Sequence, residues 1–530
     1  MAERMSAREA IALVCDAFTE QELADLSAMD DGPLGWAGYG AQRARASRRT
    51  GSAESVVHGT ATLGDTRCVV ISFEFGFLGG SLSERAGDRL EAAYTLAREH
   101  RLPLVSLIAT GGSRMQEGMV ALSQLQRVAR ASALLREARV AHIAVLRDPT
   151  TGGGWATLGA GADVVLALPG AQVGFAGSRV RPSDADPTAY TAEGQLAAGQ
   201  IDAIVRPESL RGTLAFWVTA LGTGAPSDRA GRAGTPGTAA ANGPDDDTTG
   251  TPPAGSSTGA EPSGTIAAAT AGVHGPARAA AGVTGSRPQG PSAGATAAGP
   301  ADGAGGPGSS RPQAIAPPRA LGGGGELPRS GWDAVRQARA AGRPRAQEYL
   351  DDYFTRREPL RGDRCGGDDP GMLCGVGLRD GRPVAYAAQC GTATTPAGYR
   401  TAARVIRLAD RLGLPVLTLI DTPGAANGAD AERSGAGAAI AELFGTVAAA
   451  RTPLTSLLIG EGGSGGALAL AAPGNTWATP DSYFSVIAPE LAAAILKRAP
   501  DRVAHTADQL RLRPQDLVEL GVVRGIVGPE

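Results

Sequence analysis

The chain has 530 residues and a formal net charge of -3. This length exceeds what a single hydrophobic core usually supports, so we expect more than one domain. The near-neutral charge does not indicate the basic surface of a nucleic-acid-binding protein, and no apolar run is long enough to cross a membrane. Five cysteines without a CxxC pair and a start without a secretory signal predict reduced thiols and a cytoplasmic protein.

The first part of the chain predicts an α/β domain. Residues 1–29 are expected to form a helical or irregular N-terminal segment, and residues 30–222 the first domain. A strand at 68–75 is followed by a helix through Leu90 and Leu96, and a second strand at 102–110 ends at Gly111 and Gly112. Strand, helix and strand in this order predict right-handed parallel crossovers.

A composition change marks the end of that domain. Residues 223–329 consist largely of Gly, Ala, Pro, Ser and Thr, with few large apolar side chains. Such a segment cannot bury enough apolar surface to offset the entropy that ordering costs. We therefore predict a long disordered linker that lets the flanking domains dock without dictating their geometry.

The second domain, predicted over residues 330–530, repeats the order of the first. A strand at 382–388, a helix at 399–412 and a strand at 415–420 follow one another, and the run at 414–424 echoes the run at 102–112. The echo continues downstream, where residues 142–154 correspond to residues 454–466. The chain therefore reads as two related α/β domains.

Each repeat ends a buried strand with a glycine pair, Gly152 and Gly153 in the first and Gly465 and Gly466 in the second. Without a Cβ atom the backbone can approach a ligand closely, and free N–H groups at the start of a helix suit an oxyanion. The alternative is that these glycines only permit tight turns. Two pairs at matching positions favour a catalytic role.

Side-chain catalysts have less support. The five histidines show neither metal-ligand spacing nor a serine partner, and ordinary structural roles suit them; they are His58, His100, His142, His274 and His505. Glu117 could act as a general acid or base, although support of a helix start is the better reading. Arg114, Arg179 and Arg181 flank the glycine-rich segments and could bind a phosphate-bearing cofactor, against the alternative of solvated surface arginines.

Several motifs together resemble the carboxyltransferase component of bacterial acetyl-CoA carboxylase, with its beta and alpha subunits joined in one chain. The beta-like motifs lie at residues 73–81, 111–117, 148–153, 174–177 and 199–205. The alpha-like motifs lie at residues 398–400, 420–425, 459–467 and 483–487. Their combination and order make the resemblance specific.

The resemblance implies two crotonase-type domains and transfer of a carboxyl group from carboxybiotin to an acyl-CoA, typically acetyl-CoA to malonyl-CoA. One glycine pair would hold the thioester enolate and the other the biotin ureido oxyanion, so that no protein base is needed. The beta-like half would bind CoA and the alpha-like half would face biotin. The residues expected to border the two ligands are Gly111, Gly112, Arg114, Gly177, Arg179, Gly424 and Gly463.

The same resemblance implies partners. The chain has a single lysine, Lys497, in a segment that reads as a helix, and it has no Gly-Lys-Ser/Thr triplet. It therefore contains neither a P-loop nor a biotin attachment site. Biotin is expected on a separate biotin carboxyl carrier protein, ATP is expected to be used by a partner biotin carboxylase, and the fused chain is expected to form a homodimer.

Three departures from the family pattern stand out. The beta subunit usually begins with a four-cysteine zinc ribbon, but only Cys15 precedes the first domain here, so no zinc is expected. The family's Tyr-Pro-Gly after the alpha-like Asp-Thr-Pro-Gly-Ala motif is Ala426, Asn427 and Gly428 in this chain, and the segment after Arg179 is shorter. These changes bear on the preference among acyl-CoA substrates.

Other functions remain open at this point. The chain could carboxylate propionyl-CoA or another acyl-CoA, decarboxylate a malonyl thioester with the same fold, or serve as a noncatalytic scaffold subunit. A crotonase-type hydratase or isomerase would need suitably placed carboxylates, and the two glycine pairs disfavour it.

Overall fold

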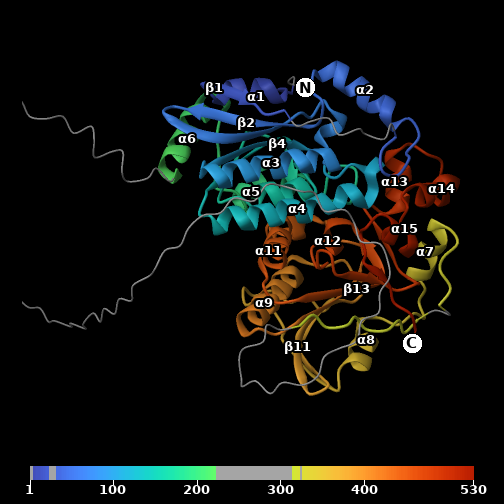
Figure 1. The fold of residues 1–530 in the computed structure, drawn as a ribbon. Coiled ribbons are helices and arrows are strands. Elements are labelled where there is room, and N and C mark those ends of the chain that lie inside the picture. Colours follow the sequence, from blue (N-terminus) through green and yellow to red (C-terminus); the bar gives the residue numbers. More distant parts are fainter. Residues whose placement is uncertain (1–3, 23–30, 223–312, 323–324, 530) are drawn as a thin grey trace, which may run out of the picture. The chain divides into compact units, whose positions relative to one another are not determined.

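The computed structural model describes residues 4–22, 31–222, 313–322 and 325–529 (Figure 1). The predicted linker lies outside the described residues up to residue 312. Its predicted end at residue 329 is wrong, because Ala320 is buried and Arg319 and Leu321 bond to Asp352 and Tyr349. The described residues on its two sides belong to one compact unit. We call residues up to 222 the first half and residues from 313 the second half.

The first half is built on a sheet with strand order β1-β2-β3-β4-β5-β6-β8, and β7 pairs with β5. Its strands are β1 (Ala17–Glu20), β2 (Val56–Leu63), β3 (Thr66–Phe73), β4 (Leu104–Thr110), β5 (His142–Thr151), β6 (Val164–Ala167), β7 (Val173–Gly174) and β8 (Ala203–Ile204). Its helices are α1 (Ala7–Val14), α2 (Tyr39–Thr50), α3 (Glu84–His100), α4 (Gly118–Glu137), α5 (Ala192–Ala197) and α6 (Pro207–Leu221).

The second half is built on a sheet with strand order β16-β14-β13-β12-β11-β10-β9, and β15 pairs with β13. Its strands are β9 (Arg356–Pro359), β10 (Met372–Arg379), β11 (Arg382–Gln389), β12 (Val416–Thr422), β13 (Leu454–Gly463), β14 (Thr476–Ala478), β15 (Tyr483–Ser485) and β16 (Gly525–Ile526). Its helices are α7 (Gly331–Ala338), α8 (Ala346–Tyr353), α9 (Pro396–Leu412), α10 (Ala429–Arg433), α11 (Ala436–Ala449), α12 (Ser464–Leu468), α13 (Pro489–Ile495), α14 (Val503–Gln509) and α15 (Pro514–Glu519).

The expected parallel crossovers are confirmed in both halves. Strands β3, β4, β5 and β6 pair in parallel, as do β11, β12, β13 and β14. The register shifts at the same place in each, between Ile108 and Thr110 and between Ile420 and Thr422. The two halves are thus copies of one crotonase-type α/β fold. Each copy also has an antiparallel edge, formed by β1 and β2 with β3 and by β9 and β10 with β11.

Local sequence explains the helices that follow the first parallel strand of each half. Helix α3 begins at Ser83, whose side chain accepts from the Ala86 amide. Helix α9 begins at Thr395, whose side chain accepts from the Gly398 amide, with Pro396 at its first position. These are favoured helix starts because they satisfy amides that the helix itself leaves free. The short β1 joins the first sheet although it precedes residue 30, where we placed the start of the first domain.

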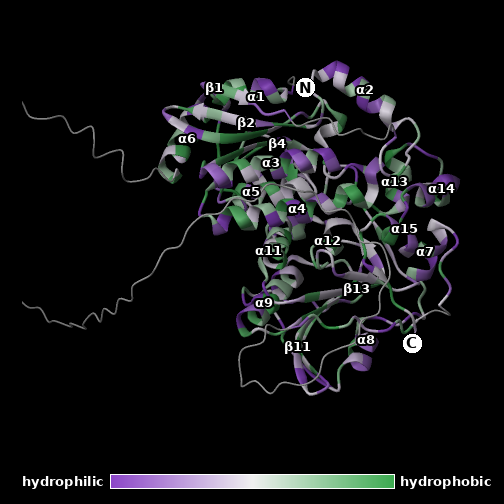
Figure 2. Cartoon of the chain, in the orientation of Figure 1, coloured by the Kyte–Doolittle hydropathy of each residue, from purple (hydrophilic) through white to green (hydrophobic). Residues whose placement is uncertain are grey.

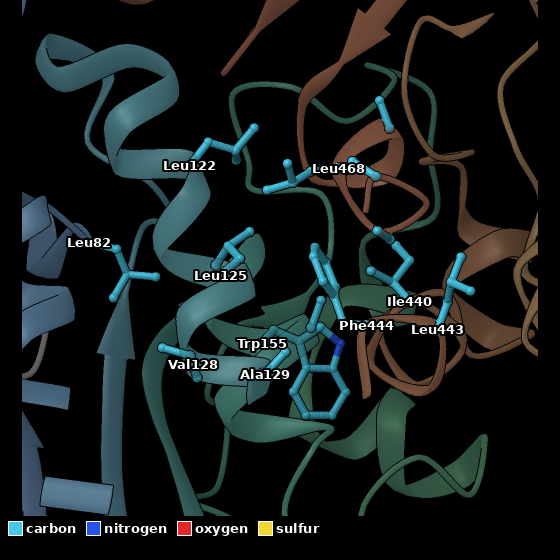
Figure 3. Packing of buried hydrophobic residues seen from close by; sticks show 14 of the residues in the cluster. Leu82, Leu122, Leu125, Val128, Ala129, Trp155, Ile440, Leu443, Phe444 and Leu468 are labelled. Carbon is cyan, nitrogen blue, oxygen red and sulfur yellow. The ribbon is translucent and has the colours of Figure 1, made fainter. Parts of the chain in front are cut away.

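The halves share buried apolar side chains. Trp155, Leu122 and Leu125 of the first half and Ile440, Phe444 and Leu468 of the second belong to one cluster (Figure 3). Helix α4 contacts α11 and α12, and α11 contacts the short helical turn at Trp155–Gly159.

Hydrophilic residues predominate along α2 and α7 (Figure 2). No helix of the described residues is long and apolar enough to span a bilayer.

Candidate active site

The two glycine pairs lie in equivalent turns after β5 and β13. The residue that leaves the strand has a left-handed backbone in both, with φ 66° at Gly152 and 56° at Ser464. A residue with a side chain is strained in the left-handed conformation. Because Ser464 nevertheless adopts it, the surrounding structure must hold this turn in place. Gly152 is therefore equivalent to Ser464 and Gly153 to Gly465, in agreement with the matching of residues 142–154 with 454–466. The two glycine pairs are thus offset from one another by one residue.

The amide of Gly152 is already bonded. It donates to the carbonyls of Gly174 and Phe175, at 3.2 and 3.1 Å. Gly153 and Gly154 begin the helical turn that follows. The first amides of a helix have no partner within it. Gly152 therefore shapes the turn, and Gly153 and the residue after it are the better donors to an oxyanion.

Gly465 has more space for a side chain than Gly463 and Gly466 have. A Cβ atom there would lie no closer than 3.6 Å to any other residue, an ordinary contact. At Gly466 it would lie 2.5 Å from the Ala425 amide nitrogen, and at Gly463 it would collide with the Pro423 carbonyl. Packing within the chain explains the glycines at 463 and 466 but not the one at 465. Close approach of a ligand would explain it.

A second pair of glycines packs against these turns. Gly112 and Gly424 have φ of 102° and 138°, and their amides donate to the hydroxyls of Thr110 and Thr422. A Cβ atom on Gly152 would lie 3.2 Å from the Cα atom of Gly112. These glycines allow two backbone segments to touch. The structure thus gives Gly112, Gly424 and Gly463 a packing role, whereas Gly111 donates its amide to the carbonyl of Gly79.

Leu125 of α4 lies between the two glycine turns. Its Cδ1 atom would be 2.5 Å from a Cβ atom on Gly153 and 3.6 Å from one on Gly465. Figure 3 shows Leu125 on the side of α4 that faces the second half. The fold therefore brings Gly153 and Gly465 to the same leucine side chain, at the contact between the halves.

The loop 174–181 borders both turns. Its Gly174 and Phe175 carbonyls accept from Gly152, and the Phe175 ring would be 3.8 Å from a Cβ atom on Gly465. A Cβ atom on Gly177 would be 3.5 Å from the Thr151 hydroxyl. Arg179, two residues later, is exposed. Gly177 therefore lies beside Thr151, the last residue before the first turn, and Arg179 lies two residues further along the same loop.

The second half holds this loop. Glu432 of α10 is 1% exposed and accepts from the amides of Phe175 and Ala176, at 3.1 and 2.8 Å. Burial raises the pKa of Glu432 to about 7, although these two hydrogen bonds oppose the rise. Asn427 donates its side-chain amide to the Val180 carbonyl, and Tyr190 donates to the Asn427 carbonyl. Sequence reasoning missed Glu432 because only the fold brings it to residue 175.

The second turn is braced by buried polar groups. The Gly466 carbonyl accepts from Gln389 and from Tyr399. Asp421, fully buried at the end of β12, is paired with Arg343 and with Arg345 and accepts from the Glu461 amide. These contacts hold the strand ends on which the turn depends.

The Arg114 side chain is buried and therefore not accessible to a cofactor. Its side chain is 1% exposed and forms an ion pair with Glu54, at 2.6 Å. Its remaining N–H groups donate to Ser81 and Tyr39, so all five are used. This argues against our prediction that Arg114 binds a phosphate-bearing cofactor. Arg181 stacks on the Tyr190 ring, 4.9 Å from its centre.

Glu117 also has a structural role, and it supports a different helix from the one expected. Its carboxylate accepts from the Glu84 amide at the start of α3 and from the Tyr39 hydroxyl. Burial raises its pKa. The described histidines include two buried ones, His58 and His142, and burial lowers the pKa of each, to about 4 and about 3. Over the described ranges, no group of three His, Cys, Asp or Glu side chains could hold a metal ion.

Two cavities lie away from the glycine turns. One, of about 640 Å³, lies beside α2 and is lined by Arg43, Glu54 and Phe77 among others. The other, of about 440 Å³, lies between the halves and is lined by Arg136, Arg407 and Glu442 among others. Neither contains a residue that we predicted for the site.

Comparison with known proteins adds to this geometry. The family model described as "Carboxyl transferase domain" matches residues 37–205, and the model described as "Acetyl co-enzyme A carboxylase carboxyltransferase-like" matches residues 329–530.

Curated relatives match nearly the whole chain. The "Acetyl-coenzyme A carboxylase carboxyl transferase subunits beta/alpha" of Salinispora arenicola is 38% identical over 90% of this chain and 74% of its own length. The protein of the same name from Salinispora tropica is 36% identical over 99% of this chain and 82% of its own length. Among solved structures, the transcarboxylase 12S hexamer is 16% identical, with a TM-score of 0.34 over 99% of this chain and 87% of the matched chain.

Proposed function

Because the chain belongs to the family of fused beta/alpha carboxyl transferase subunits of acetyl-coenzyme A carboxylase, we propose that it transfers a carboxyl group from carboxybiotin to acetyl-CoA and so forms malonyl-CoA. The observation that carries the proposal is the glycine turn that recurs in both halves, with Gly153 and Gly465 beside the same Leu125 side chain. Biotin arrives on a separate carrier protein after a biotin carboxylase has loaded it with ATP. The reaction takes place in the cytoplasm.

The glycine turns supply the catalytic groups. In the first half, Gly152 provides the left-handed turn and Gly153 an amide for the thioester oxyanion. In the second half, the amides of Gly465 and Gly466 receive the ureido oxyanion of biotin. Losing one such donor typically raises a barrier by about 3 to 4 kcal/mol.

Carboxybiotin supplies the carboxyl group and, once that group has left, a basic ureido nitrogen that takes the α-proton of the thioester. The protein therefore needs no side-chain base. This agrees with the structural roles of Glu117 and His142. The loop with Gly177 and Arg179 lies on the acyl-CoA side, and the exposed guanidinium of Arg179 is suited to a phosphate of CoA. The residues that bind the remainder of CoA belong to the same half.

The first test measures the reverse reaction. Purified protein is expected to move radiolabelled carboxyl from malonyl-CoA to free biotin or a biotinylated carrier, faster than from methylmalonyl-CoA. A preference for methylmalonyl-CoA would assign a propionyl-CoA carboxyltransferase instead. Label lost without biotin would identify a decarboxylase, and a folded protein with no turnover in the presence of carrier would identify a scaffold.

A glycine variant then tests the site. Gly465→Ala should fold normally, because the added methyl group makes only ordinary contacts. It should lower carboxyl transfer by about a hundredfold, because the methyl group would displace the ligand from the backbone amides that it must approach. The control is Gly212→Ala on α6, where the added methyl group meets nothing within 4 Å. Equal activity of the two variants would remove Gly465 from the proposed site.

A further inference from the structure

Among the described residues, Glu432 makes the shortest hydrogen bond between the second half and the backbone of loop 174–181. Its two carboxylate oxygens accept separately from Phe175 and Ala176, at 3.1 and 2.8 Å. Both bonds involve a charged acceptor when the carboxyl is ionised, which makes them stronger than bonds between neutral groups. Glu432 is 257 residues from Phe175 in the chain, so the contact is purely tertiary.

Loop 174–181, which Glu432 holds, contacts both glycine turns. The carbonyls of Gly174 and Phe175 accept from the amide of Gly152, which shapes the first turn. The Phe175 ring lies in ordinary contact range of the second turn at Gly465. A shift of residues 175 and 176 would therefore disturb Gly152 through its two hydrogen bonds, and Gly465 only through the van der Waals neighbourhood of the Phe175 ring.

Further contacts anchor the same loop on both sides of Arg179. The Val180 carbonyl accepts from Asn427, and the Val180 amide donates to Gly177. Tyr190 bonds to the Asn427 carbonyl, and Arg433 pairs with Asp186. Asn427 stands at the position of the proline in the family's Tyr-Pro-Gly, and it bonds to Val180 in the segment after Arg179, which is the shortened one. The two departures noted in the sequence thus meet in space.

We infer that Glu432 is a positioning residue of the acyl-CoA site: across the contact between the halves it holds loop 174–181 in the shape that presents Gly177 and Arg179 to the thioester substrate. This rests on the proposed function. The biotin-facing half thereby determines the shape of the substrate-binding loop in the other half. Asn427 and Tyr190 support the same loop with neutral hydrogen bonds.

The test replaces Glu432 by alanine and measures two quantities. Hydrogen exchange of the amides in residues 174–181 should rise about tenfold, the size expected for loss of a charge-assisted hydrogen bond. In the reverse assay the KM for malonyl-CoA should rise about tenfold. The KM for biotin should stay within about twofold, a split that general destabilisation would not produce. The control is Glu442→Ala on α11, whose half-exposed carboxylate pairs with Arg407 away from the loop.

If Glu432→Ala does not fold, Tyr190→Phe and Asn427→Ala carry the test, each with an expected rise of about threefold in loop exchange. A folded Glu432→Ala with wild-type loop exchange and malonyl-CoA KM would overturn the inference, as would unchanged exchange in the two milder variants. Failure of the proposed function looks different. The wild-type protein itself would then transfer no carboxyl group to biotin, while the exchange measurement would still report whether Glu432 holds the loop.

Discussion

At the scale of single residues, Glu432 should make stability depend on pH near neutrality. Burial holds its folded pKa at about 7, above the ordinary value of 4.5, so the folded protein binds this proton more tightly than the unfolded chain does. Its contribution to stability is therefore fully present below pH 4.5 and is lost as pH rises through 7. The polar groups that act on it are the amides of Phe175 and Ala176 and the Gln195 side chain; Glu432 in turn raises the pKa of Tyr190, which Arg181 and Arg433 lower.

Glu432→Gln removes this titration. Relative to wild type, the variant should gain on the order of 2 kcal/mol of unfolding free energy between pH 5.5 and pH 8.5. Urea denaturation at the two pH values measures the gain. A difference between variant and wild type that is the same at both pH values would show that Glu432 does not titrate in this range.

Single residues also show where the sequence was insufficient. Gly465 and Arg114 occur in equally recognisable motifs, yet a methyl group would fit beside the first, whereas the second is fully buried against Glu54. A motif identifies the position but not the partners of a side chain. Glu54 precedes Arg114 by 60 residues, and no local pattern links them. The buried pairing therefore could not be predicted.

At the scale of elements, the contact between α11 and the turn at Trp155–Gly159 requires a glycine. A methyl group on Gly437 would collide with the Trp155 indole, whereas one on Gly445 of the same helix would lie 3.7 Å from its nearest neighbour. Gly437→Ala should therefore destabilise the protein by about 1 to 3 kcal/mol through overpacking. Gly445→Ala should be neutral or slightly stabilising, because alanine favours helix. Thermal unfolding of the two variants checks this, and equal midpoints would contradict the close packing.

The sequence predicted the buried parallel strands better than any other feature of the structure. The repeated apolar runs identified β4, β5, β12 and β13, because fully buried parallel strands are nearly continuous in hydrophobic residues. The antiparallel edge strands carry exposed and half-exposed positions, as in β1 and β9, and their pattern is weaker. The strand expected to run to residue 75 ends at Phe73, because Glu74 accepts from the Gly76 amide and the Phe77 amide donates to the Glu74 carbonyl.

At the scale of the whole molecule, the two halves should stay together after the chain between them is cut. A protease site inserted at residue 260 and cleaved in the folded protein should give two fragments that elute as one species on size exclusion. The shared apolar cluster holds them. Phe444→Asp should separate the cleaved fragments, since it would bury a charge in that cluster. Spontaneous separation of the wild-type fragments would show that the linker, and not the core, joins the halves.

The shared cluster has a consequence for how such a protein can change over generations. Trp155 and Leu125 pack directly with Ile440 and Phe444, so an altered side chain in one half must be accommodated in the other (Figure 3). One gene that encodes both partners inherits such compensating changes together. A chimera that joins the first half of this chain to the second half of a distant relative would mismatch them, and it should require matched exchange of these four positions before it folds.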